Sequence, residues 1–294
     1  MSVTVDRLLQ MRKQAGITQT QGVKDKPANL IGRSRPIGVT PEELRRLLGT
    51  RGRSHESLQA PIPGRSIDRS LPGCEIEPGL FYVERLLPWP APSEPIVVDA
   101  KTHGPIEPAR VLCFDTETTG LAGGAGTRAF MIGVSEWTSR GLRVRQLLTA
   151  TLRAEAAMLR SFAQWIQPQH ILVSYNGKCY DSTLLATRYR LARMRNPLVG
   201  LPHADLLFAV RRRYRGIWEN CKLATVERQL LAIARDDDLP GSEAPAAWLR
   251  FLRGDDAVNL RRVLAHNHQD VVSLMLLLAK LASPQLAAWQ VATR

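Results

Sequence analysis

Residues 111–120 read VLCFDTETTG, an apolar run that leads directly into two acidic residues, Asp115 and Glu117. The apolar run predicts a buried strand, and on an extended backbone side chains two residues apart point to the same face. Two carboxylates held so close repel each other unless a proton or a cation lies between them. Asp-x-Glu alone is common in loops, but with this apolar lead-in it favours a divalent metal site at a strand end.

The chain on either side of this stretch predicts an α/β domain. Residues 128–137 and 142–149 are strand-like and a short turn separates them, so these strands and the one before Asp115 are expected to be antiparallel neighbours. A fourth, buried strand is expected at 170–174. Helices are predicted at 151–166, 182–194, 204–214, 222–233, 243–252 and 256–281. This order describes a mixed sheet, three antiparallel strands and then parallel ones, flanked by helices.

A second acidic segment, YNGKCYD at 175–181, follows the fourth strand. Asp181 is expected at the entrance of the next helix, where an aspartate is also an ordinary N-cap. Asn176 and Gly177 are typical turn residues. Lys178 either contacts a substrate backbone or is an exposed lysine of the turn.

The third acidic segment is HNHQD at 266–270, within the last predicted helix. His266 and Asp270 are four residues apart and therefore share a helical face. An apolar stretch follows Asp270 directly, and a carboxylate beside so much apolar surface is costly unless it is paired or binds a metal. The alternative is a solvated face with a hydrogen bond between the two side chains.

The composition favours a polyanionic partner. Forty Lys and Arg against twenty-seven Asp and Glu give a formal net charge of +13, which favours nucleic acid, although such charge also serves solubility alone. No apolar run is long enough to cross a bilayer, and the N-terminus lacks the pattern of a secretory signal. Four scattered cysteines argue for reduced thiols and against zinc, so a cytoplasmic protein is expected.

Residues 1–70 are predicted to be a flexible basic arm. They carry thirteen Lys or Arg against six Asp or Glu, and the first aromatic residue of the chain is Phe81. One short helix is expected near 41–48, where TPEE supplies capping signals, and it docks either on the main body or on a protein partner. Residues 71–108 are expected to be a transitional strand segment packed on the main domain at 109–285.

The three acidic segments occur in one order, within FDTETTGLAGGAGT, LVSYNGKCYDSTLL and VLAHNHQDVVSL. In these motifs the chain resembles the DEDD superfamily of 3′→5′ exonucleases, and more closely the bacterial YprB-type ribonuclease H-like proteins, over about residues 74–282. The resemblance implies a ribonuclease H-like fold. It also implies a metal-dependent 3′→5′ exonuclease that hydrolyses the phosphodiester bonds of nucleic acid.

The resemblance also implies residue roles. Two divalent ions, Mg²⁺ or Mn²⁺, would be held by four carboxylates: Asp115, Glu117, Asp181 and Asp270. His266 holds the place where many members have a tyrosine, and is the candidate general base, with His268 as the weaker one. The expected substrate-binding residues are Thr118, Asn176 and Lys178.

Two alternatives stay open on the same fold. A nucleic-acid-binding protein without cleavage is disfavoured by the four intact carboxylates, and a structure-selective endonuclease would use a similar metal site. The glycine-rich segment at 120–126 lacks the ending of a phosphate-binding P-loop and is interpreted as a wide turn. Residues 211–215 (RRRYR) are either a track for a nucleic-acid strand or a solvated helix face.

Overall fold

The computed structural model of the chain describes residues 67–97, 104–120, 125–235 and 239–282. The predicted helix near 41–48 and nearly all of the predicted arm lie outside the described residues. Residues 68–70, the last of that arm, contact the main domain: the Asp68 carbonyl accepts a hydrogen bond from Ala257 N–H at 2.8 Å, and Arg69 lies over the ring of Phe251.

The described residues form one seven-stranded sheet with the order β1-β2-β5-β4-β3-β6-β7. The pairs β3–β6 and β6–β7 are parallel, and the other neighbours are antiparallel. The strands are β1 (Cys74–Glu77), β2 (Leu80–Leu87), β3 (Val111–Thr118), β4 (Ala129–Thr138), β5 (Gly141–Thr149), β6 (Ile171–Ser174) and β7 (His203–Asp205). The predicted mixed sheet, with its antiparallel trio β3, β4 and β5, is confirmed.

The main helices also follow the prediction. They are α3 (Glu155–Trp165), α4 (Asp181–Leu191), α5 (Leu206–Tyr214), α6 (Leu223–Val226), α7 (Ala244–Leu252) and α8 (Val258–Ala282). A π-helical turn, Glu227–Leu231, continues α6, and Ala232 ends it in the left-handed conformation with φ 54°. Short 3-10 turns at Pro108–Arg110, Leu152–Ala154 and Gly241–Glu243 complete the order.

Two details of the sheet differ from expectation. Ile96 lies in the segment 71–108 that was expected to carry strands, but it makes only an isolated bridge to Ile106. His203 and Ala204 belong to β7, whereas the sequence suggested a helix from 204 onward. The expected helix begins two residues later, at Leu206, because Asp205 caps α5 by accepting the Leu207 N–H at 3.1 Å.

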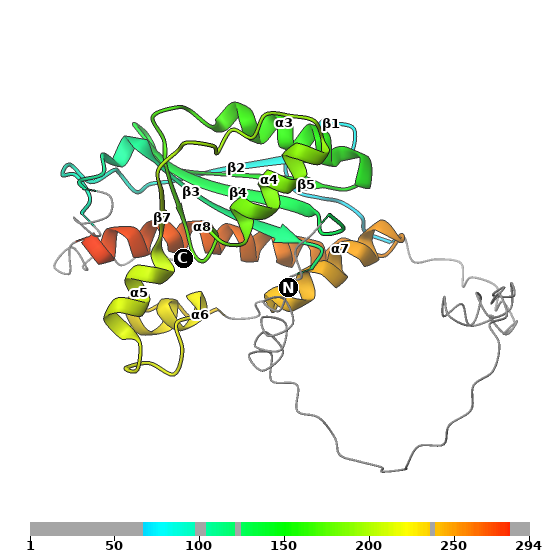
Figure 1. Cartoon of the computed structure of the whole chain (residues 1–294). Coiled ribbons are helices and arrows are strands. Elements are labelled where there is room, and N and C mark those ends of the chain that lie inside the picture. The colour runs from blue at the N-terminus through cyan, green and yellow to red at the C-terminus, as the bar shows by residue number, and fades with distance from the viewer. Residues whose placement is uncertain (1–66, 98–103, 121–124, 236–238, 283–294) are drawn as a thin grey trace, which may run out of the picture. The chain divides into compact units, whose positions relative to one another are not determined.

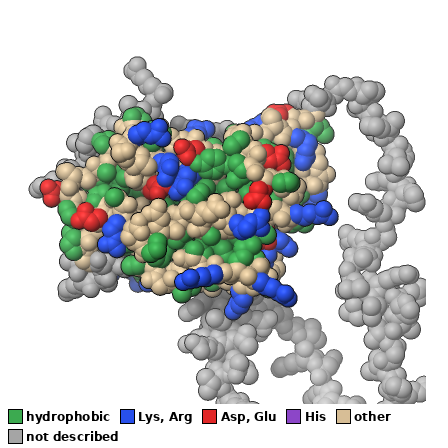
Figure 2. Space-filling model, turned by 90° about the horizontal axis from the view of Figure 1, so that it is seen from above, with side chains coloured by type: hydrophobic (Ala, Val, Ile, Leu, Met, Phe, Trp, Pro, Cys, Tyr) green, Lys and Arg blue, Asp and Glu red, His purple; other side chains and the backbone are tan. Residues whose placement is uncertain are grey.

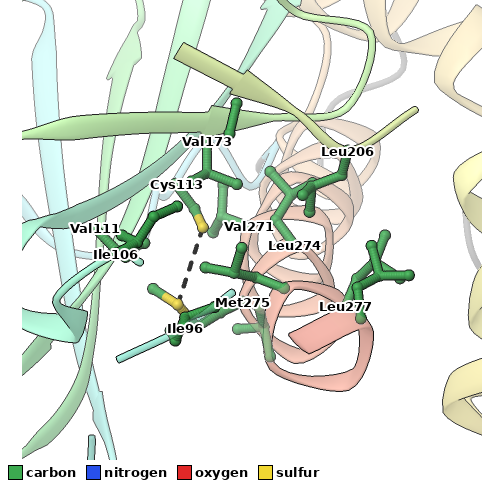
Figure 3. Close-up of a cluster of buried hydrophobic side chains, with 14 of the residues drawn as sticks. Ile96, Ile106, Val111, Cys113, Val173, Leu206, Val271, Leu274, Met275 and Leu277 are labelled. Atoms are coloured by element: carbon green, nitrogen blue, oxygen red, sulfur yellow. Dashed lines mark hydrogen bonds between the residues drawn. The ribbon is translucent and has the colours of Figure 1, made fainter. Parts of the chain in front are cut away.

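Helices cover both faces of the sheet, α3 and α4 on one side and α8 on the other (Figure 1). The alternation of β3 explains how: Leu112 and Phe114 pack in the core under α3 and α4, whereas Val111 and Cys113 pack against α8. Figure 3 shows Cys113 beside Met275, with the two sulfur atoms 4.0 Å apart. Each side chain of β3 is therefore assigned to one face.

The outer surface is mixed in character. Figure 2, seen from above Figure 1, shows basic and acidic side chains dispersed among apolar ones. No helix in the described part of the chain is long and apolar enough to span a membrane.

Candidate metal centre

Asp115 and Glu117 lie on the face of β3 that is turned to α8. Cys113, two residues before Asp115, packs against α8, and strand side chains alternate between faces. Asn267 of α8 donates a hydrogen bond from Nδ2 to Oδ2 of Asp115 at 3.0 Å, and Glu117 is buried. The two carboxylates therefore share a face, as their spacing predicted.

Asp181 approaches β3 from the loop that follows β6. Because β6 runs parallel beside β3, the two strands end at the same edge of the sheet, and Asp181 is the first residue of α4. Thr116, between the two acidic residues of β3, donates a hydrogen bond from Oγ1 to Oδ1 of Asp181. A Cβ on Gly177 would lie 2.8 Å from Oδ2 of Asp181, so this glycine allows the loop to approach the carboxylate. The N-cap position of α4 is occupied by Tyr180 and not by Asp181.

The helix α8 contributes His266 and Asp270, one turn apart. Nε2 of His266 lies 3.4 Å from Oδ2 of Asp270. With Glu117 they form a group in which one ligand atom from each residue lies within 4.8 Å of the others. Carboxylate oxygens and imidazole nitrogens are ligands of divalent metals, so this group could hold an ion.

The electrostatics join these residues into one cluster. Burial raises the pKa of Asp115 well above its usual range. The neighbouring carboxylates of Asp270, Asp181 and Glu117 raise it further. Burial also raises the pKa of Asp181 to about 6. Because three carboxylates act on Asp115 at once, the acidic residues of all three sequence segments are close together, and such a cluster retains protons or a cation.

A basic residue that the sequence did not single out lies in the same cluster. Arg235 pairs with Glu227 through Nε to Oε2 at 2.7 Å and Nη2 to Oε1 at 2.6 Å. It also donates from Nη2 to Oδ1 of Asp270 and from Nη1 to Nδ1 of His266, the latter at 3.1 Å. Burial alone would lower the pKa of Arg235, but its bonds to the two carboxylates raise it, so the guanidinium stays charged. Glu227 is fully buried and is neutralised by this arginine.

Arg235 also fixes the tautomer of His266. A guanidinium has donors and no acceptor, so Nδ1 of His266 accepts the bond from Arg235. A neutral imidazole then carries its proton on Nε2, which faces Asp270. In this arrangement Nδ1 of His266 is held by Arg235 and Nε2 faces Asp270.

A second set of residues that the sequence analysis did not single out positions the carboxylate of Asp115. Gln146 of β5 donates from Nε2 to Oδ1 of Asn267 at 2.9 Å, and both side chains are buried. Gly133 of β4 is the strand neighbour of both Asp115 and Gln146, and a Cβ on Gly133 would overlap Oδ1 of Asn267. The bare glycine thus lets Asn267 lie against β4 while it donates to Asp115.

The expected substrate-binding residues lie around the cluster. Thr118 donates from Oγ1 to the carbonyl of Gly120 at 3.1 Å. The backbone N–H groups of Asn176 and Lys178 donate to the carboxylate of Asp205 at 2.7 and 3.2 Å. The Lys178 residue itself is exposed, at the turn that leads to α4.

His268, the weaker candidate for the base, lies about 200° around α8 from His266, at 100° per residue. Burial, together with the nearby charge of Arg85, lowers the pKa of His268 to about 4. Within the described residues, Nδ1 of His268 has no hydrogen-bond partner. Its surroundings therefore differ from those of the carboxylate cluster.

Residues 112–282 match the RNase H superfamily. The chain belongs to this superfamily. It is similar to the uncharacterized protein YprB of Bacillus subtilis (strain 168), with 39% identity over 163 residues. That alignment covers 55% of this chain and 39% of the relative, so the chain spans well under half of the relative's length.

Two solved structures share a looser likeness. The family B DNA polymerase of the hyperthermophilic archaeon Pyrobaculum calidifontis is similar over 69% of this chain and 31% of its own, with 17% identity and a TM-score of 0.46. E. coli exonuclease I in complex with a dA16 oligonucleotide is similar over 60% of this chain and 42% of its own, with 16% identity and a TM-score of 0.38.

Proposed function

We propose that the chain is a metal-dependent nuclease that removes nucleotides from the 3′ end of nucleic acid. The observation that carries this proposal is the convergence of three other carboxylates on Asp115, whose pKa is raised by burial and by these three neighbours. So many carboxylates can lie close together only if protons or cations bind to them. Bound divalent cations are what enzymes use to cleave phosphodiester bonds. The resemblance of the three acidic segments to those of DEDD exonucleases supports the same proposal.

The residues present fit divalent ions. The proposed ligands are Asp115, Glu117, Asp181 and Asp270, and an oxygen-rich set of this kind suits Mg²⁺ or Mn²⁺. When bound, such ions supply positive charge for the attacking and leaving oxygens of a phosphodiester. Asn267 and Thr116 orient two of these carboxylates through the hydrogen bonds described above.

His266 is the proposed general base, since an imidazole nitrogen can accept a proton from an attacking water. The bond from Arg235 occupies its Nδ1, so the base becomes available only when that bond is broken or exchanged. Arg235 and a metal ion would also compete for Asp270. We propose that cation binding at the cluster and release of Arg235 from Asp270 occur together.

The same arginine favours a second candidate. Because Arg235 already pairs with Asp270, the arrangement also suits a nucleic-acid-binding protein on this fold that does not cleave. The two candidates differ in one measurable property, which is turnover in the presence of divalent ions.

The experiment is a time course of the chain with 5′-labelled linear single strands and closed circles of DNA and RNA, each with Mg²⁺ or Mn²⁺. A ladder that shortens from the 3′ end, with intact circles, is the expected result. Cut circles would indicate the endonuclease instead. Intact linear strands in all conditions would contradict cleavage and favour the binding protein.

A further inference from the structure

A cavity of about 590 Å³ opens beside the loop that follows β6. Its walls come from that loop, from α5 and from the segment that joins α5 to α6. Figure 1 shows α5 and α6 as neighbouring elements at one end of the sheet. None of the four proposed metal ligands lines this cavity, so it is a separate space.

The lining is strongly basic. Arg211, Arg215 and Lys222 line the cavity, and all three residues are exposed. Glu219 is the one acidic residue in the lining, and it pairs with Arg228, which is outside the lining. The net charge of the cavity wall therefore favours a polyanion, and guanidinium groups are suited to phosphate.

An aromatic surface lies in the same wall. Trp218 lines the cavity and stacks on Tyr214, with the ring centroids 3.9 Å apart and the planes at 6°. Tyr214 itself is outside the lining. Aromatic side chains next to a basic groove are the combination by which proteins bind single-stranded nucleic acid.

The cavity is joined to the carboxylate cluster by one short loop. Asn176 lines the cavity, and its neighbour Gly177 lies against the carboxylate of Asp181. Asp205, the N-cap of α5, holds this loop in place through the Asn176 N–H at 2.7 Å. The loop thus has the cavity on one side and the carboxylate of Asp181 on the other.

We propose that this cavity binds the phosphate backbone and a stacked base of a single strand of nucleic acid whose end lies at the carboxylate cluster. The part of this proposal that places the strand's end at the carboxylate cluster rests on the proposed function. The arginines and Lys222 contact phosphates, and Trp218 stacks on a base. Because neither contact reads a base edge, binding is independent of sequence.

The test is the binding of labelled single-stranded DNA and RNA to the full chain in EDTA, from low to moderate salt. The pocket variant is Arg211→Ala/Arg215→Ala. The control variant is Arg140→Ala/Arg190→Ala, which removes the same charge. Arg140 lies in the turn between β4 and β5, and Arg190 lies in the last turn of α4, about 13 Å along the helix from Asp181.

Removing one phosphate contact lowers the salt slope for a single strand by about 0.7, so the pocket variant should have a slope smaller by about 1.4. That corresponds to binding about 25-fold weaker at about 0.1 M salt, whereas the control variant should bind nearly as the parent does. Trp218→Ala should weaken binding by about 5- to 150-fold and leave the slope unchanged. Affinity and slope that stay at the parent's values in the pocket variant, or that fall equally in the control, would overturn the proposal.

The two proposals fail separately. Binding that depends on Arg211 and Arg215 without any cleavage in Mg²⁺ supports the cavity's role and overturns the nuclease. Cleavage in Mg²⁺ combined with parental binding by the pocket variant overturns the cavity's role alone. Comparing the DNA and RNA arms shows which sugar the single strand carries.

Discussion

Asp115 is the carboxyl on which the other acidic groups of the cluster act. Burial and three neighbouring carboxylates all raise its pKa. An acid whose pKa is raised in the folded chain favours folding where it is protonated and opposes folding where it is ionised. Without divalent ions, the contribution of Asp181 to the free energy of unfolding therefore falls as the pH rises from about 4, its unfolded value, through about 6, its folded pKa. The contribution of Asp115 changes in the same direction.

Asp115→Asn removes one of these charges and should relieve this loss. In EDTA the variant should gain stability relative to the parent as the pH rises from about 4 to 7, and the two should converge in acid. Urea unfolding at several pH values measures the free energy of unfolding of both chains. Subtracting one from the other at each pH removes the contribution of the groups that titrate alike in both. Adding Mg²⁺ should stabilise the parent more than the variant. A pH-independent difference would contradict the electrostatic account.

At the level of elements, the turn after α6 brings Arg235 to the buried Glu227. Removing one partner of a buried ion pair leaves an uncompensated charge, so Arg235→Ala should cost about 3–5 kcal/mol of unfolding free energy. Removing both charges in Arg235→Ala/Glu227→Gln should recover part of that loss. The matched control is Arg228→Ala, which breaks the exposed pair with Glu219 and should cost less than about 1 kcal/mol. Equal losses in the two single variants would refute the role given to this pair.

The contact between β4 and α8 offers a second test at this scale. A Cβ on Gly133 would displace Asn267, which orients Asp115. Gly133→Ala should therefore reduce the rate of cleavage by about 10- to 100-fold, the usual cost of disturbing a residue that orients a metal ligand. It should also cost roughly 1–3 kcal/mol of stability through overpacking. Gly126→Ala, where an added Cβ meets nothing, is the control for both rate and stability.

The elements that the sequence predicted are those with long apolar patterns. The alternation in β3 predicted that Asp115 and Glu117 share one face of the strand, opposite Leu112 and Phe114. The helical spacing predicted that His266 and Asp270 lie on one side of α8. The strand β7 was missed because three residues cannot display a period.

The contacts that complete the site were not readable from the sequence. Arg235, which bonds to Asp270, follows a π-helical turn that ends at Ala232 in the left-handed conformation, and no sequence motif signals that geometry. Asn267 did carry a signal, since it lies three residues before Asp270 in a predicted helix. Gln146 carried none, because its role depends on the register between β4 and β5.

For the whole molecule, the basic arm predicted from the sequence adds a testable contribution to binding. Residues 68–70 contact α7 and α8, so the chain to compare is one that lacks residues 1–66. If the arm lies along the nucleic-acid backbone, its removal should weaken binding and lower the salt slope by about 0.7–0.9 for each phosphate that the arm neutralises. Turnover of bound substrate should change little, since the proposed ligands lie between 115 and 270. An unchanged slope would instead favour the arm as a tether for a protein partner.

The central claim is that the clustered carboxylates hold the metal that drives cleavage. The most direct measurement is the rate of 3′-end shortening of a 5′-labelled single strand with Mg²⁺ or Mn²⁺, for the parent and for Asp115→Asn and Asp270→Asn. Both variants should fold and lose at least about a hundredfold in rate, while Asp255→Asn, which changes an exposed carboxylate beside α8, should keep the parental rate. A folded Asp115→Asn or Asp270→Asn chain that shortens the strand at the parental rate would contradict the account.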